Sequence, residues 1–218
     1  STYAIITTVD HDHMECYEDE NDLIHSFAQF ANAVPFYGAV SVCMDDPLIK
    51  KVIPLISRPL LTSGLSDDAD FTANNIRYEE VSTTFDVLQN GTILGTVTLQ
   101  IPGQHNVTNA LTVIALCLEI GMEMDVIAKG MNSFTGVRRR FEIKGVFDEI
   151  MVVDDYAHHP TEVSATLKAV REGWNRRIIA VFQPHLFSRT RDFFHEFATV
   201  LTMADCIVIT DIYPAREK

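Results

Sequence analysis

The sequence lacks the features that mark several large classes of protein. No stretch of its 218 residues approaches the roughly 20 consecutive apolar residues that a membrane-spanning helix needs. The first residues, STYAIITTVDHDH, carry acid where a secretory signal carries base. Seventeen lysines and arginines stand against 30 aspartates and glutamates, a formal net charge of −13. Such a charge repels nucleic acid, so we expect neither a membrane protein nor a DNA or RNA binder.

Cysteine is also scarce, and its spacing excludes a disulfide framework. The four cysteines are far apart and form no CxxC pair, and three of them lie in apolar runs. This pattern favours reduced core thiols in a cytoplasmic protein. Because 47% of the residues are hydrophobic, the chain is neither disordered nor fibrous.

No glycine-rich phosphate loop is present. Neither GxxxxGK[ST] nor GxGxxG occurs in the sequence. If the chain uses a nucleotide, the main cradle for its phosphates is missing from these residues.

The hydrophobic patterns predict an α/β protein in two parts. Residues 1–136 predict a mixed sheet with helices, including a hairpin at Gln89-Asn90-Gly91 between strands 77–88 and 92–101, and a long helix over 105–120. Residues 137–218 predict a parallel α/β domain, with strands 150–153, 178–182 and 207–210 alternating with helices 160–172 and 190–203. The chain opens directly in a strand-like run, which suggests a piece of a longer protein.

Polar clusters follow each of the three strands of the second part. They are residues 154–160, 183–191 and 211–217. Because the carboxyl ends of parallel strands share one edge, we expect Asp155, His158 and Arg189 to converge there, with Arg216 as a further candidate. The helix that Pro160 opens points its N-terminal dipole at the same edge, which favours an anion. The alternative is that these are ordinary loop and cap residues.

The segment Asp10-His11-Asp12-His13-Met14-Glu15 follows the first strand. Two histidines and three carboxylates within six residues predict a divalent metal site, and the imidazoles favour Mn²⁺ or Zn²⁺. A solvated acidic turn is the alternative.

The segment Pro102–Asn109 opens the long helix. Asn106 and Asn109 are three residues apart and share a face, and their carboxamides suit the edge of a heterocycle. Capping of the helix by His105 or Asn106 is the alternative.

Three adjacent arginines, Arg138, Arg139 and Arg140, precede Phe141. Arginine binds phosphate or carboxylate with two parallel hydrogen bonds, so an anion site is predicted. A surface hinge paired with the abundant acids is the alternative.

Taken in order, the segments DHDHME, PGQHNVTNA, FTGVRRRFE, DDYAHHPTE and FQPHLFSRTRDF resemble the Mur ligase family of peptidoglycan synthesis. The resemblance implies that residues 1–136 are the rear of the central ATP-binding domain and residues 137–218 the front of a Rossmann-like C-terminal domain. The last two segments point within the family to the member that joins L-alanine to UDP-N-acetylmuramate.

The resemblance also implies roles in binding ATP and its metal. His13 matches a histidine that coordinates Mg²⁺, in place of the metals that the ligand types favour. Asn106 and Asn109 match residues at the adenine, Arg140 an arginine at the phosphates, and Asp155 an acid near the ribose.

The substrate side follows from the same resemblance. Tyr156, His158 and Arg189 match residues near UDP-N-acetylmuramate and the incoming L-alanine, and His158 is a candidate for the chemistry together with His13 and Arg140. Leu186 stands where many members have a second arginine, and Arg191 or Arg216 are candidates to replace it.

The implied reaction is ATP-dependent amide formation through an acyl phosphate. We expect the chain alone to be catalytically inactive, because the phosphate loop is missing. Three alternatives remain: a recycling ligase that attaches a tripeptide to UDP-N-acetylmuramate, a metal-dependent hydrolase that uses His11, His13 and the His158-His159 pair, and a non-catalytic nucleotide-binding module.

Overall fold

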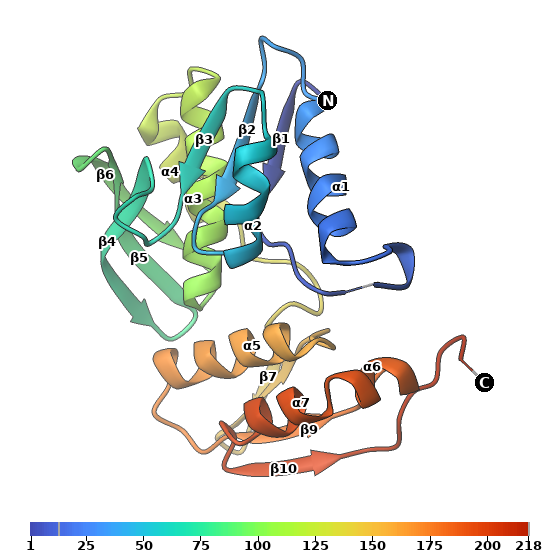
Figure 1. Cartoon of the computed structure of the whole chain (residues 1–218). Coiled ribbons are helices and arrows are strands. Elements are labelled where there is room, and N and C mark those ends of the chain that lie inside the picture. Colours follow the sequence, from blue (N-terminus) through green and yellow to red (C-terminus); the bar gives the residue numbers. More distant parts are fainter. Residues whose placement is uncertain (13, 218) are drawn as a thin grey trace. The chain divides into compact units, whose positions relative to one another are not determined.

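The computed structural model describes residues 1–12 and 14–217, and it divides them into two compact α/β units (Figure 1). One unit comprises Ser1–Arg77, Thr83–Gln100 and His105–Phe134. The other comprises Tyr78–Ser82, Ile101–Gln104 and Thr135–Lys218. The predicted fold class, a mixed sheet with helices followed by a Rossmann-like part, is confirmed.

The first unit is built on a six-stranded sheet. Its strands follow one another in chain order: β1 (Tyr3–Ile6), β2 (Ala39–Cys43), β3 (Leu60–Ser63), β4 (Phe71–Glu79), β5 (Ser82–Gln89) and β6 (Thr92–Leu99). Strands β1 to β4 pair in parallel, and β5 and β6 form an antiparallel hairpin. Asn90 and Gly91 turn this hairpin with φ angles of 48° and 80°, as the Asn-Gly signal predicts.

Helices cover both faces of the parallel strands. They are α1 (Glu20–Asn32), α2 (Pro47–Val52), α3 (Gln104–Glu119) and α4 (Met124–Ser133), with two 3₁₀ turns, η1 (Met14–Cys16) and η2 (Ile53–Leu55). Val40 and Val42 of β2 pack in one buried cluster with residues of α1 and α2. Between them, the Ser41 hydroxyl donates to the carbonyl of Thr112 in α3 at 2.8 Å. Because side chains alternate along a strand, β2 is covered on both sides.

One strand boundary in this unit differs from the prediction. The strand expected over residues 77–88 is divided by a turn, and residues before the turn belong to β4. Glu80 adopts φ 50° there. The turn contains no glycine, proline or asparagine, so the sequence gives no signal that would divide the predicted strand here.

The second unit contains two short pairs of strands. β7 (Glu142–Phe147) and β8 (Ile150–Asp154) are antiparallel, and β9 (Ile179–Phe182) and β10 (Cys206–Ile209) are parallel. The prediction of one parallel sheet is confirmed for β9 and β10 and is wrong for β8, whose partner in the described residues is β7. The register of the β7–β8 pair shifts between Ile143 and Gly145, and this irregularity hides β7 from a search for regular alternation.

Three helices complete the second unit: α5 (Pro160–Gly173), α6 (Phe187–Asp192) and α7 (Phe194–Leu201). The single helix expected over residues 190–203 is broken at Phe193, which has φ −111° and ψ 25°. Val163 and Leu167 of α5 pack with Phe182, Phe197 and Leu201 in the buried cluster of this unit.

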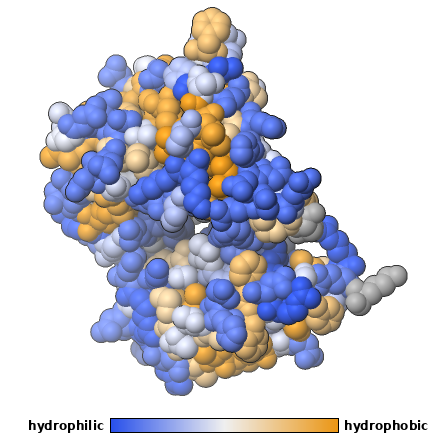
Figure 2. Space-filling model, in the orientation of Figure 1, coloured by the Kyte–Doolittle hydropathy of each residue, from blue (hydrophilic) through white to orange (hydrophobic). Residues whose placement is uncertain are grey.

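Aliphatic side chains remain exposed on β9 and β10. Val181 and Ile209 are 70% and 61% exposed, and Figure 2 shows hydrophobic residues gathered at the end of the second unit where these strands lie. Among the described residues, no helix combines the length and hydrophobicity that crossing a membrane requires.

Candidate functional site

The loop between β8 and α5 is organised by the carboxylate of Asp155. It accepts hydrogen bonds from the backbone N–H of Phe141 at 2.9 Å, the backbone N–H of Ala157 at 2.8 Å and the hydroxyl of Thr166 at 3.0 Å. These donors come from the arginine-rich segment, the loop itself and α5. Asp155 therefore connects the arginine-rich segment, the β8–α5 loop and α5 by hydrogen bonds. Its position in the sequence does not predict this structural role.

The arginine-rich segment lies against the same loop. The Arg139 carbonyl accepts from the backbone N–H of Tyr156 at 2.7 Å, and the Arg139 guanidinium lies 4.5 Å from the centre of the Tyr156 ring. A cation over an aromatic face is a favourable electrostatic contact. Arg140 instead reaches α5, where its Nη1 donates to Glu162 at 3.0 Å. The Arg140 guanidinium also lies 6.0 Å from the centre of the Tyr156 ring, so both arginines lie near Tyr156 and Arg140 is in addition bound to α5.

Histidine and arginine side chains from two loops meet in the second unit. The His158 ring centre lies 5.7 Å from that of His185, which in turn stacks on Tyr213 at 5.6 Å. Nη1 of Arg189 donates to Nδ1 of His185 at 3.1 Å, and Arg189 is only 7% exposed. The predicted convergence of His158 with Arg189 is therefore present, with His185 between them.

The protonation states of the two histidines follow from their partners. Nδ1 of His158 lies 2.8 Å from the Tyr156 carbonyl oxygen, which only accepts, so Nδ1 carries the proton. Nδ1 of His185 accepts from Arg189, so His185 carries its proton on Nε2. Burial, followed by the positive charges of Arg189 and His158, lowers the pKa of His185 below its ordinary value of 6.5.

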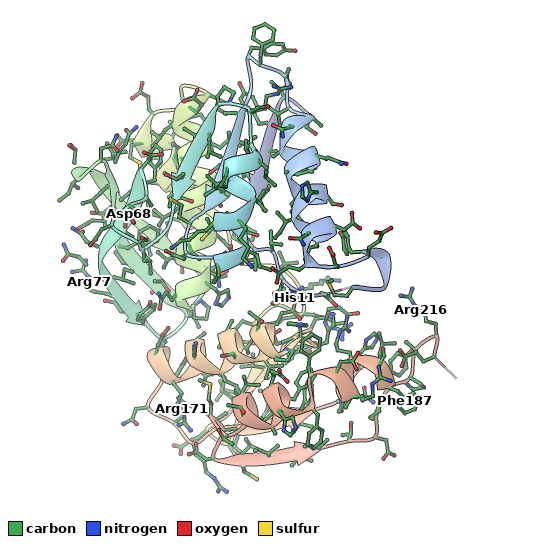
Figure 3. The ribbon with its side chains drawn as sticks, viewed as in Figure 1. His11, Asp68, Arg77, Arg171, Phe187 and Arg216 are labelled. Carbon is green, nitrogen blue, oxygen red and sulfur yellow. The ribbon has the colours of Figure 1, made fainter. Side chains whose placement is uncertain are left out.

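Leu186 adopts a backbone conformation that is uncommon for its type, with φ 70°. It precedes α6, whose first residue Phe187 is labelled in Figure 3. Of the two arginines proposed to replace the missing arginine at this position, Arg191 is 77% exposed and pairs with Asp192 at 2.7 Å. Arg216 is exposed on the segment that follows β10 (Figure 3).

In the first unit, Asn106 and Asn109 lie in the first turns of α3. Both are half-buried, while Val107 between them is fully buried. Since α3 begins at Gln104, His105 and Asn106 lie inside the helix and neither precedes it as a cap. The helix follows Gly103, whose φ of 98° suits glycine and brings the chain sharply into the first turn.

The acidic segment after β1 holds an ion-pair cluster in its described part. Nε2 of His11 lies 2.9 Å from Glu20, and Lys51 donates to the same carboxylate at 2.6 Å (His11 is labelled in Figure 3). Lys51 first, then His11, lower the pKa of Glu20. His13, the predicted metal ligand, lies outside the described residues. Within residues 1–12 and 14–217, no three histidine, cysteine or acidic side chains are grouped to hold a metal ion.

Asp46 connects the start of α2 to Val9, in the segment that follows β1. One carboxylate oxygen caps α2 by accepting from the backbone N–H groups of Leu48 and Ile49, each at 2.8 Å. The other oxygen accepts from the backbone N–H of Val9 at 3.2 Å. Burial raises the pKa of Asp46, against these hydrogen bonds, which lower it. The Asp-Pro pair predicts the cap, and the contact with Val9 becomes visible only in the structure.

Sequence reasoning missed several residues of this site. They are His185, Tyr213, Glu162 and Thr166. Glu162 carried a signal: it stands three residues after His159, the spacing of a glutamate that caps the start of a helix. The others are brought in by tertiary contacts.

Both units are α/β in structure. The second unit holds several arginines, most of them partly exposed, in defined orientations, which is typical of proteins that bind anionic substrates. Residues 1–117 match the model of the Mur ligase middle domain, and residues 139–218 match that of the Mur ligase, glutamate ligase domain. The chain belongs to the Mur ligase family.

Individual relatives agree with this assignment. The chain is 46% identical over 217 residues to UDP-N-acetylmuramate–L-alanine ligase of Geotalea uraniireducens, covering 100% of this chain and 47% of the relative. Among solved structures, UDP-N-acetylmuramate-alanine ligase of Thermotoga maritima superposes with a TM-score of 0.79 at 30% identity, over 97% of this chain and 46% of that one. The chain thus spans about half the length of the curated relatives it matches.

A more distant structure supports the fold alone. MurF ligase of Thermotoga maritima, solved in complex with ADP, has a TM-score of 0.79 at 18% identity, over 95% of this chain and 48% of that one. The same architecture therefore persists where most of the sequence has changed.

Proposed function

We propose that this chain is part of an ATP-dependent ligase that joins L-alanine to UDP-N-acetylmuramate during peptidoglycan biosynthesis in the cytoplasm. The observation that carries the proposal is the contact of Arg189 with His185, beside His158, in a chain 46% identical to ligases of that name. A buried, always-charged arginine suits a substrate carboxylate, and both the muramoyl group and alanine have one.

The proposed reaction forms an amide bond in two steps. The muramoyl carboxylate attacks the γ-phosphorus of ATP and releases ADP, which gives an acyl phosphate. The amine of L-alanine then attacks the acyl carbon, and inorganic phosphate leaves as one proton is lost from the nitrogen. Positive side chains stabilise the charge that grows on the transferring oxygens in such steps.

Each proposed residue has a task within its own unit. Arg140 binds phosphate oxygens, and Asn106 with Asn109 binds the adenine edge. Tyr156 and Arg189 hold the muramoyl substrate and the amino acid. Nε2 of His158 is the ring nitrogen left for a hydrogen bond with the attacking amine, because Nδ1 is engaged with the Tyr156 carbonyl oxygen.

Two proposed contacts rest on the resemblance alone. His13 would hold Mg²⁺, a cation that screens phosphate charge when bound. Asp155 would lie near the ribose, although its oxygens already accept three internal hydrogen bonds.

A chimeric enzyme tests the proposal. The 218 residues replace the matching half of the Geotalea uraniireducens ligase, and ADP release is measured with each substrate omitted in turn. We expect release that requires both UDP-N-acetylmuramate and L-alanine. A folded chimera that accepts a tripeptide in place of L-alanine would support the recycling ligase, and one that hydrolyses esters or amides without ATP would support the hydrolase.

A further inference from the structure

Glu162 joins two groups that the proposed function uses. Its Oε1 accepts from Nη1 of Arg140 at 3.0 Å. Its Oε2 accepts from the backbone N–H groups of His158 at 2.9 Å and His159 at 3.2 Å, at the start of α5. One carboxylate therefore connects the arginine-rich segment to the loop that carries His158.

The backbone around Arg140 is fixed independently of its side chain. Arg139 and Phe141, on either side, have φ angles of 59° and 47°, which non-glycine residues rarely adopt. The Arg139 carbonyl accepts from Tyr156, and the Phe141 N–H donates to Asp155. Strained conformations of this kind persist where the surrounding structure enforces them. These backbone contacts do not set the direction of the Arg140 side chain, whose guanidinium contacts Glu162 and lies 6.0 Å from the centre of the Tyr156 ring.

Glu162 restricts that direction while it leaves the guanidinium accessible. The Arg140 side chain is 51% exposed, and Glu162 is its hydrogen-bond partner among the residues that the structure describes. The hydrogen bond engages one nitrogen, so the other N–H donors are available to an anion. An arginine that is already oriented loses less side-chain entropy when it binds.

The surroundings of Glu162 stabilise its charged carboxylate form. Burial would raise the pKa of its carboxyl group, but the hydrogen bonds from His158 N–H and Arg140, with the charges of both side chains, outweigh burial and lower it. Two backbone N–H groups and the N-terminus of α5 also offset its negative charge, so it repels a neighbouring phosphate less than a solvated carboxylate does.

We propose that Glu162 is a positioning residue that orients Arg140 for phosphate oxygens and couples it to the His158 loop. This inference rests on the proposed function for its ligand, and on the hydrogen bonds above for its geometry. Glutamine at position 162 keeps a carbonyl oxygen that can cap α5, and it removes the charge that holds the arginine.

The experiment compares the 218-residue chain with Glu162→Gln and with Asp192→Asn, which removes the same charge from an exposed pair with Arg191. Arginine side-chain NMR reports the motion of Arg140, amide exchange of His158 and His159 reports the cap, and inorganic triphosphate is the ligand probe. We expect Glu162→Gln to release Arg140, to keep both amides protected, and to weaken triphosphate binding about three- to tenfold. Asp192→Asn should change none of these.

Two results would overturn the inference. The first is an Arg140 guanidinium that is equally mobile in the wild type and in Glu162→Gln. The second is tighter triphosphate binding by Glu162→Gln, which would show that the carboxylate competes with the anion. A third result separates the inference from the proposed function. If Glu162→Gln releases Arg140 but triphosphate never perturbs the Arg140 signals, the positioning contact stands and the phosphate role of Arg140 is wrong.

Discussion

The carboxylate of Asp155 accepts a hydrogen bond from the backbone N–H of Phe141, fourteen residues earlier in the chain, at 2.9 Å. This contact ties the segment that carries Arg140 to the loop that carries His158. The same carboxylate also accepts hydrogen bonds from Ala157 and Thr166. Asp155 is therefore, with Glu162, one of two side chains that hold the candidate site together.

Replacing Asp155 should therefore destabilise the second unit. Asp155→Ala leaves three partly buried donors without their acceptor, so we expect the free energy of unfolding to fall by about 2–3 kcal/mol. Urea denaturation measures the loss, and faster amide exchange at Phe141 and Ala157 locates it. The control is Asp154→Asn, whose nearest cations, Arg139 and Lys144, lie 3.9 Å away. That variant should change the free energy by less than about 0.5 kcal/mol. Equal losses in both variants would contradict the account of Asp155.

The titration of His185 provides a second prediction. Its pKa is lowered by burial first and then by the charges of Arg189 and His158, so NMR titration should find it below 6.5. Arg189→Gln removes the nearest of these charges and should raise the pKa toward that value. The sign for stability follows from linkage: above pH 6.5 both states are neutral at this group, and as pH falls below 6.5 the unfolded state binds the proton more readily. Stability from this group is therefore lost on acidification, and a pKa above 6.5 in the wild type would contradict the buried, arginine-bound geometry.

Asp46 provides a third prediction, in the first unit. Asp46→Ala removes the cap of α2 and the acceptor for Val9, and should cost about 1–3 kcal/mol of stability. Amide exchange at Val9 should rise in the same variant. Asp68→Ala, at an exposed position in the same unit (Figure 3), is the matched control and should be nearly neutral. An unchanged Val9 amide in Asp46→Ala would contradict the role given to the contact between Asp46 and Val9.

The isolated chain provides a fourth prediction. Its sequence has no GxxxxGK[ST] loop, so the 218 residues alone should show no alanine-dependent release of ADP, even with millimolar substrates. A coupled assay measures this, with the chimera as positive control. Turnover by the purified chain would mean that another part of it cradles the triphosphate.

Features set by neighbouring residues could be predicted from the sequence. Asn90-Gly91 supplies two positive φ angles to a hairpin, and the structure has the hairpin where the sequence predicts it. Asp46-Pro47 is a signal of the same local kind, since it caps and opens α2. The apolar stripe of α3 likewise defined its face and nearly its limits. In each case, the physical cause lies within a few residues of its effect.

Features set by distant pairing could not be predicted in the same way. β7 is defined by its hydrogen bonds to β8, and its register shifts between Ile143 and Gly145. The contact of Glu162 with Arg140 spans 22 residues, and Tyr213 reaches His185 from beyond β10. The position of the polar clusters after parallel strands predicted His158 and Arg189 as candidates, and the resemblance gave them a role. His185, which lies between them, is identified only by the structure.

The central claim, that the cluster around Arg189 binds the amino-acid substrate, is tested most directly by steady-state kinetics of the chimera with Arg189→Gln. The lost charge-assisted hydrogen bonds should raise the KM for L-alanine about 10- to 100-fold, with the KM for ATP changed less than about twofold. Circular dichroism and the melting temperature establish that the variant is folded. An unchanged KM for L-alanine in a folded variant, or a rise confined to ATP, would contradict the claim.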